Sequence, residues 1–210
     1  MLASCSYPHL DEIKVDDAHL PSSTETERIG TQKTDLFVFV GERIEVVEFK
    51  PEGEILMDQA YKARYRVIEN VFGAFDGNTI EFEAYDHYGF PPFAKFKNVL
   101  LFVSKHEGKL YHEKYQYFDV YQTLEGKWAG CGDPHSRHEV HRKPFTPKQL
   151  EFALPVVFDL TKLTDKQIKQ LYPTPYFEVN GKKARCRMGA YVDELFSIKR
   201  NGVLTARGLF

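Results

Sequence analysis

The fold is decided by residues 35–122, where five apolar segments follow one another with turn-forming residues between them. They read DLFVFVGERIEVVEFK (35–50), YKARYRVI (61–68), TIEFEAY (79–85), NVLLFVS (98–104) and LYHEKYQYFDVY (110–121). In several of these segments apolar and charged residues alternate with the period of two that is typical of half-buried strands. The stretch therefore predicts five consecutive β-strands.

Two features of these segments indicate how the strands are arranged. Gly41 interrupts the first strand, and a glycine inside a strand often marks the bulge that lets a sheet bend strongly. The fourth segment, residues 98–104, is apolar enough to be covered on both faces. We therefore expect a mainly β fold, a five-stranded OB-like Greek-key barrel. A two-sheet sandwich is the alternative.

The order of four segments resembles the netrin-like module, the OB-type barrel of the tissue inhibitors of metalloproteinases. The segments are Asp35–Gly41, Tyr61–Val67, Ile80–Phe82 and Leu100–Val103. The resemblance implies a barrel over residues 34–128 and permits protease inhibition through a processed Cys5. The family, however, is stapled by many disulfides, and no second cysteine lies near Cys5 here. A shared fold alone assigns no function.

The charge composition argues against two classes of partner. Lys and Arg number 28 against 30 Asp and Glu, which gives a net charge of −2. Such a balance provides no electrostatic footprint for nucleic acid or for an anionic membrane surface. No window approaches the roughly 20 apolar residues that a membrane-spanning helix requires. We therefore expect neither nucleic-acid binding nor a membrane span.

The amino-terminal residues suggest a compartment. Met1-Leu2-Ala3-Ser4-Cys5 is similar to the end of a bacterial lipoprotein signal, in which the cysteine becomes acylated. Residues 1–33 would then be an extended or disordered lead-in that tethers the barrel in the cell envelope or periplasm. The alternative is that translation begins at Met1, that Cys5 is an ordinary residue and that the protein is cytoplasmic.

Residues 129–210 predict a polar connection and a small α+β appendage. The expected elements are a strand at 155–160, a helix from the Thr164 cap to Leu171, a hairpin around Asn180-Gly181 and a last helix at 189–200. An appendage of this size buries too little apolar surface to be stable alone, so it should dock on the barrel. A disulfide between Cys131 and Cys186 would staple it in an exported protein.

The loop after the third strand, YDHYGFPPF (85–93), concentrates aromatic and titratable groups. Its candidate ligand-binding residues are Tyr85, Asp86, His87, Tyr88, Phe90 and Phe93. Aromatic faces with a polar anchor are typical of a ligand rim. The structural alternative is that these rings plug one end of the barrel. A second row of aromatic residues, Tyr111, Tyr115, Tyr117 and Tyr121, predicts either an exposed stripe or a second buried face.

Histidines in the polar connection suggest a metal site as a competing interpretation. Cys131, His135, His138 and His141 carry donors that zinc or copper accepts, but glycine and proline in this connection argue against a helix that gathers them. The disulfide and the metal site would need the same Cys131 sulfur. We expect no metal and no other cofactor.

No catalytic motif accompanies these residues, since the chain has no phosphate-binding glycine loop, no nucleophile elbow and no metalloprotease signature. We therefore expect a non-enzymatic binding module of a bacterial cell envelope whose partner is a protein or a small molecule. One alternative is a metal-dependent or acid/base enzyme that uses His87 with Asp86. Another is a metalloprotease inhibitor.

Overall fold

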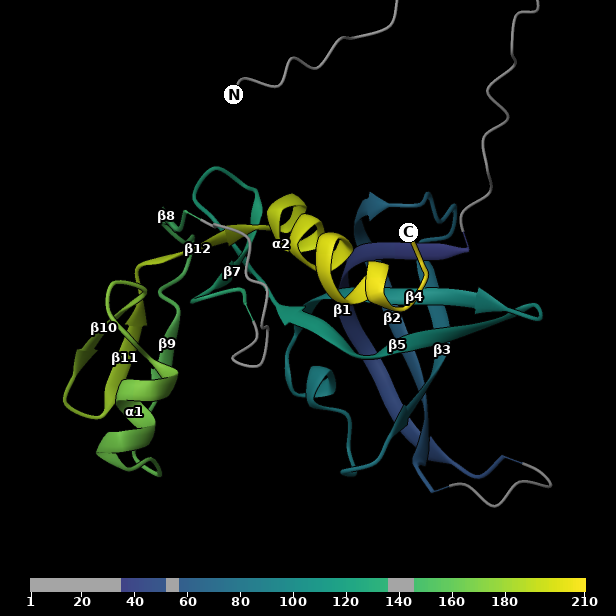
Figure 1. The fold of residues 1–210 in the computed structure, drawn as a ribbon, viewed down its shortest axis with the longest axis horizontal. Helices are drawn as coiled ribbons and strands as arrows, with labels where there is room; N and C mark the ends of the chain where they lie inside the picture. The colour runs from purple at the N-terminus through teal and green to yellow at the C-terminus, as the bar shows by residue number, and fades with distance from the viewer. Residues whose placement is uncertain (1–34, 52–56, 136–145) are drawn as a thin grey trace, which may run out of the picture. The chain divides into compact units, whose positions relative to one another are not determined.

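The computed structural model describes residues 35–51, 57–135 and 146–210. Within these residues the chain is mainly β, as predicted (Figure 1). Cys5, the expected lead-in, His138 and His141 lie outside the described residues.

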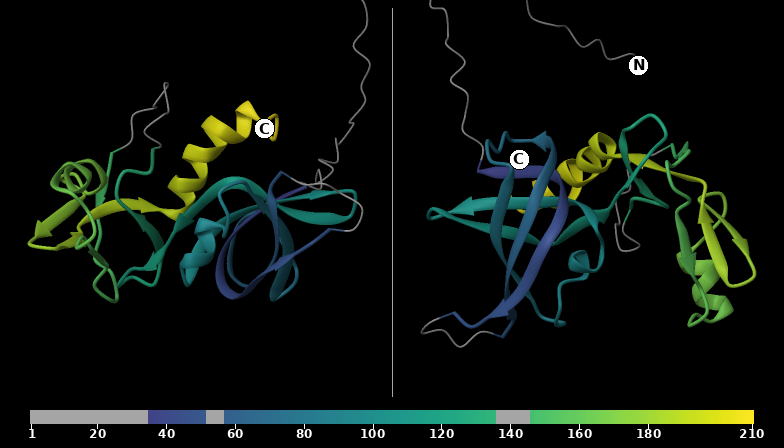
Figure 2. Two further views of the ribbon diagram at one scale, coloured as in Figure 1. Left: turned by 90° about the horizontal axis from the view of Figure 1, so that it is seen from below. Right: turned by 180° about the vertical axis from the view of Figure 1, so that it is seen from behind.

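Five strands form a closed ring in the order β1-β2-β3-β5-β4. They are β1 (Leu36–Phe49), β2 (Gln59–Phe72), β3 (Thr79–Asp86), β4 (Asn98–His106) and β5 (Lys109–Asp119). Neighbours pair antiparallel except β3 and β5, which pair in parallel, and the β1–β4 pair closes the ring (Figure 2). The five predicted strands are thus confirmed.

A register shift lies beside Gly41, where a bulge was expected, but its extra residue is Ile68 of β2, and the extra residue in β1 is Ile44. The pairing register between β1 and β2 shifts between Val40 and Gly41. A Cβ atom at Gly41 would lie 2.9 Å from the Phe39 ring and 3.0 Å from the Tyr65 ring. A side chain at this position would press on both rings, so glycine lets them stay packed inside.

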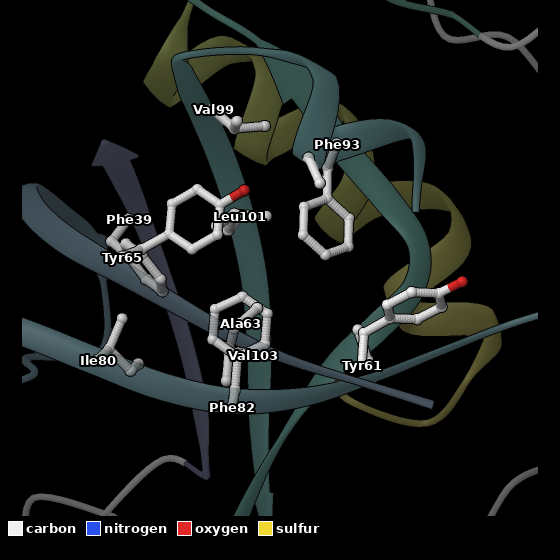
Figure 3. Close-up of a cluster of buried hydrophobic side chains, with 12 residues drawn as sticks. Phe39, Tyr61, Ala63, Tyr65, Ile80, Phe82, Phe93, Val99, Leu101 and Val103 are labelled. Atoms are coloured by element: carbon white, nitrogen blue, oxygen red, sulfur yellow. The ribbon is translucent and has the colours of Figure 1, made fainter. Parts of the chain in front are cut away.

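The ring encloses an aromatic core (Figure 3). Phe39, Tyr65, Phe82 and Phe93 point toward one another there, and each is at most 2% exposed. Phe93 comes from the loop before β4, where a short 3-10 turn (Pro92–Lys95) carries it inward. The alternation of apolar and charged residues in β2 and β3 is confirmed, because the apolar members fill this core.

β4 also builds a second core on the outside of the ring. Val99, Leu101 and Val103 face the interior, whereas Leu100 and Phe102 pack against the helix α2 (Val192–Lys199) and the helical turn η2 (Arg200–Leu204) that follows it. The prediction that this strand is covered on both faces is therefore confirmed.

The last predicted helix starts later than expected, and this prediction is corrected. Met188–Tyr191 is the strand β12, which pairs with β7 (Trp128–Cys131) and with the short β8 (Lys148–Gln149), while β6 (Tyr121–Gln122) pairs with the other edge of β7. A side chain at Gly189 would collide with the backbone carbonyl of Gly130. Pairing partners distant in sequence thus outweigh the helical pattern of residues 189–191.

The other elements of the carboxyl-terminal third agree with the sequence. α1 (Asp165–Leu171) begins with the Thr164 capping box, and Figure 1 shows it beside the hairpin β10 (Phe177–Asn180) and β11 (Lys183–Cys186). β9 (Val157–Asp159) pairs with β11. A disulfide joins Cys131 to Cys186, as predicted.

Candidate functional site

The structure separates the residues of the predicted loop into buried and exposed groups. Phe93 is 1% exposed and belongs to the core, so the plug interpretation holds for it. Tyr85 is half-buried on β3, where its hydroxyl donates to Glu83 over 2.6 Å. Three loop residues remain exposed, namely His87, Tyr88 and Phe90.

Asp86 shapes the turn that presents these exposed residues. It is 5% exposed, and its carboxylate accepts a hydrogen bond from the Tyr88 backbone N–H over 2.8 Å. This is the local turn geometry that aspartate favours. Asp86 is therefore a positioning residue and does not pair with His87.

A carboxylate from another segment meets His87. Asp58, which lies just before β2, accepts a hydrogen bond from Lys114 Nζ at 2.5 Å and lies 3.4 Å from His87 Nδ1. The bond from Lys114 lowers the pKa of Asp58 below its usual range, and the same bond raises the pKa of Lys114. Both groups stay charged at neutral pH, so Asp58 joins three separate segments of the ring.

Lys114 reaches Asp58 because β5 bulges strongly. Between two pairings the register advances from Val103 to Leu101 along β4 but from His112 to Tyr117 along β5. The extra residues leave the plane of the sheet, and Tyr115 adopts a φ of 66°. A left-handed conformation of this kind is uncommon for a bulky residue, and it is found mostly where surrounding contacts hold it.

The bulge brings Tyr115 to Tyr88. The two ring centroids lie 6.2 Å apart, with Tyr88 85% exposed and Tyr115 43% exposed. Phe90, 48% exposed, stands edge-on to the Tyr61 ring. We refer to these aromatic side chains and the three charged or titratable groups beside them together as the rim patch, which comprises Asp58, His87, Tyr88, Phe90, Lys114 and Tyr115.

The carboxyl-terminal segment stabilises the bulge through hydrogen bonds from Arg207. The Arg207 guanidinium donates to Glu113 Oε2 over 2.8 Å and to the Lys114 carbonyl over 2.9 Å. The second Glu113 oxygen accepts from the Ser104 hydroxyl at 2.7 Å. The strained bulge is thus fixed on both sides before any partner arrives, which lowers the entropy cost of binding.

The arrangement supports recognition more directly than catalysis. The aromatic rings offer apolar faces, and the ion-paired Asp58 offers a polar anchor among them. The His87 and Asp58 side chains are in contact and are 50% and 27% exposed. No serine, threonine or cysteine nucleophile stands beside them among the described residues that make this patch. General acid/base chemistry alone would need a reacting group held within hydrogen-bond reach.

The histidine cluster does not assemble in the part of the chain that the structure describes. The disulfide takes the Cys131 sulfur, and the His135 backbone N–H donates to Asp133. No set of three or more metal-binding side chains occurs among residues 35–51, 57–135 and 146–210. The prediction for His138 and His141 lies outside these ranges.

The predicted tyrosine row divides at the bulge. Tyr117 packs on Phe93 in the core, Tyr121 packs in the carboxyl-terminal core, and Tyr115 alone reaches the rim patch. Sequence reasoning did not find Asp58 and Lys114. A signal was present, because either face of a regular strand over residues 110–118 would bury Glu113 or Lys114.

Comparisons with known proteins give no relative for this arrangement, since no protein-family model, no curated protein and no solved structure matches the chain. Among the described residues, none of the helices has the length and apolar character needed to cross a bilayer.

Proposed function

We propose that this protein is a non-enzymatic binding module that recognises its partner, a protein or a small molecule, with the rim patch. The observation that carries this proposal is the exposed pair Tyr88 and Tyr115, because the second ring is displayed at the cost of an unfavourable backbone conformation. Exposed aromatic side chains that cluster around a desolvated contact dominate the energetics of many interfaces.

We further propose that the ring is an OB-fold barrel of the netrin-like kind. Its strand order β1-β2-β3-β5-β4, its single parallel pair and the bulged first strand support this assignment. The fold would supply the rigid frame on which the loops present the rim patch. It does not itself specify the partner.

The proposed location is the bacterial cell envelope. A disulfide between Cys131 and Cys186 favours an oxidising compartment, because cytosolic thiols are kept reduced. An acylated Cys5 would tether the ring to the membrane surface, and mass spectrometry of the natural amino terminus tests this point. A free amine at an unprocessed Met1 would contradict the anchor.

The binding proposal is tested with a triple variant of the rim patch, His87→Ala with Tyr88→Ala and Tyr115→Asn. Asparagine is used at 115 because it tolerates a positive φ. The matched control is Leu171→Ser with Val179→Ser, which removes two apolar side chains of 44% and 43% exposure from α1 and β10. Both proteins are immobilised and used to capture partners from an envelope extract.

We expect the control to retain the partners of the parent protein and the triple variant to lose at least about tenfold in affinity, since hot-spot aromatics each contribute more than about 1 kcal/mol. Circular dichroism and urea denaturation establish that both variants fold. Equal capture by the folded triple variant and the parent would contradict the proposal.

A further inference from the structure

A pocket that shares no residue with the rim patch lies where the ring meets the β6–β7 segment. Its volume is about 370 Å³, within the range of small-molecule sites. Ile68, Trp128 and Leu154 form its apolar walls, and Tyr121 extends them. Lys97 and Glu42 line the remaining side.

The apolar walls leave large side chains in water. Leu154 is 79% exposed and Ile68 is 42% exposed, while Trp128 is half-buried beside them. Covering these side chains would remove apolar surface from water, which contributes roughly 25 cal/mol for each Å². An aromatic or aliphatic body of modest size suits a wall that ends in an indole ring.

Backbone hydrogen bonds hold the segments that line the pocket. The Lys97 carbonyl accepts from the Arg43 N–H at 2.8 Å, and the Gln122 carbonyl accepts from the Ala153 N–H at 2.9 Å. These bonds tie the strand β1 to the start of β4, and β6 to the segment that bears Leu154. The backbone of the site is therefore in place before a ligand binds, which lowers the entropy cost of binding.

The charged side of the pocket, Lys97 with Glu42, belongs to a group of three charges that Arg66 completes from outside the pocket lining. Glu42 is shared by two cations, since Lys97 Nζ lies 3.3 Å and Arg66 Nη1 lies 2.9 Å from its carboxylate oxygens. One carboxylate against two cations leaves one positive charge uncompensated within this group. The Lys97 side chain is 77% exposed, so its ammonium group is open to a further anion.

We propose that this pocket binds a small organic anion with an apolar ring or chain, such as an aromatic carboxylate or sulfonate. Trp128, Ile68 and Leu154 would hold the apolar body, and Lys97 would hold the anionic group. The proposal stands apart from the rim patch, and neither depends on the other.

Trp128 makes the proposal measurable, because it is the only tryptophan in the chain. The probe is 8-anilinonaphthalene-1-sulfonate, which accepts excitation energy from a nearby indole. We expect saturable energy transfer from Trp128 with one probe bound for each folded protein. N-Phenyl-1-naphthylamine, which has the same rings without the sulfonate, should bind about fivefold more weakly, the ratio that corresponds to about 1 kcal/mol for an exposed charge pair.

Three variants test which residues of the pocket contact the probe. Lys97→Gln should raise the Kd of the sulfonate about fivefold, because it removes the positive charge that would pair with the ligand. Glu42→Gln should lower the Kd, because it removes the carboxylate that competes with the ligand for Lys97. Leu154→Asp should abolish saturable transfer. Lys105→Gln, at an exposed lysine toward the other end of β4, is the matched control and should leave the Kd unchanged.

Three results would overturn the proposal. They are no saturable transfer from Trp128, equal affinities of Lys97→Gln, Glu42→Gln and the parent for the sulfonate, and a loss of transfer in Tyr88→Ala with none in Leu154→Asp. The last result would place the probe at the rim patch.

Discussion

Tyr115 holds a large aromatic side chain at a backbone conformation that favours glycine or asparagine. Its φ of 66° costs an L-residue about 1–2 kcal/mol relative to the usual helical or extended regions. The surrounding contacts of the bulge compensate for this cost, in particular the two hydrogen bonds from Arg207. The conformation of Tyr115 therefore lowers the stability of the fold and places the ring at the surface of the rim patch.

Substitutions at Tyr115 should separate stability from binding. We expect the free energy of unfolding of Tyr115→Asn to be at least that of the parent protein, because asparagine accepts a positive φ. That of Tyr115→Val should be about 1–2 kcal/mol below the value for Tyr115→Asn. Urea denaturation at neutral pH measures the free energy of unfolding of each. Equal stability of the two variants would show that the bulge is relaxed.

His112 gives the fold a dependence on pH below neutrality. Although part of the residue remains exposed, its ring packs 4.5 Å from the Phe93 ring and its Nε2 donates to the Gln116 carbonyl at 2.9 Å. Burial lowers the pKa of His112 from 6.5 to about 4. The folded protein therefore holds this histidine neutral, while the unfolded chain takes up a proton at higher pH.

His112 does not lower the free energy of unfolding above pH 6.5, where it is neutral in both states. The free energy of unfolding then falls as the pH decreases from 6.5 toward about 4, because the unfolded chain takes up the proton first. We expect the parent to lose about 3 kcal/mol more of its unfolding free energy across this interval than His112→Gln does, because each pKa unit corresponds to about 1.4 kcal/mol. Urea denaturation series at pH 7, 5.5 and 4.5 measure the difference. Parallel pH profiles of the two proteins would contradict a buried neutral His112.

The sequence identifies the exposed residues of the rim patch only in part. His87, Tyr88 and Phe90 were accessible to prediction because they follow a strand within one turn-rich loop. Asp58 and Lys114 were not, since their contact at 2.5 Å depends on a bulge that brings distant segments together. Local sequence patterns indicate where turns form, but they do not indicate which loops contact one another in the fold.

At the scale of single elements, the strands of the ring follow the alternation of apolar and charged residues closely. β2 alternates from Tyr61 to Val67 and β3 from Ile80 to Asp86, and both stretches lie within the predicted strands or one residue of them. β12 was missed because its four residues are too few to show a period, and its pairing with β7 spans a long stretch of chain. Short strands stabilised by distant partners carry no local signal of this kind.

The disulfide ties β7 to β11 across a separation of 55 residues. In the chain-entropy description a loop of that length corresponds to about 4 kcal/mol of stabilisation. We expect Cys131→Ala with Cys186→Ala to lose roughly this amount in urea denaturation under oxidising conditions. A reducing agent should destabilise the parent by a similar amount and leave the double variant unchanged, and an unaffected parent would contradict the staple.

At the scale of the whole molecule, one strand joins two cores. β4 fills the ring with Val99, Leu101 and Val103, and on its outer face Leu100 and Phe102 support α2 and the turn that leads to Arg207. The carboxyl-terminal segment is therefore part of the frame that holds the bulge of β5. The apolar run of residues 98–104 predicted cover on both faces, but nothing local indicated that the last helix provides it.

Recognition through the rim patch is tested most directly by site-specific photo-crosslinking. p-Benzoylphenylalanine is placed in turn at Tyr88, at Tyr115 and, as controls of comparable exposure to Tyr115, at Leu171 and Val179. Cells that produce each protein are irradiated, and the adducts are compared by mass. We predict one common partner adduct from Tyr88 and Tyr115 and none from the controls. Adducts from Leu171 or Val179, with none from Tyr88 and Tyr115, would contradict the account.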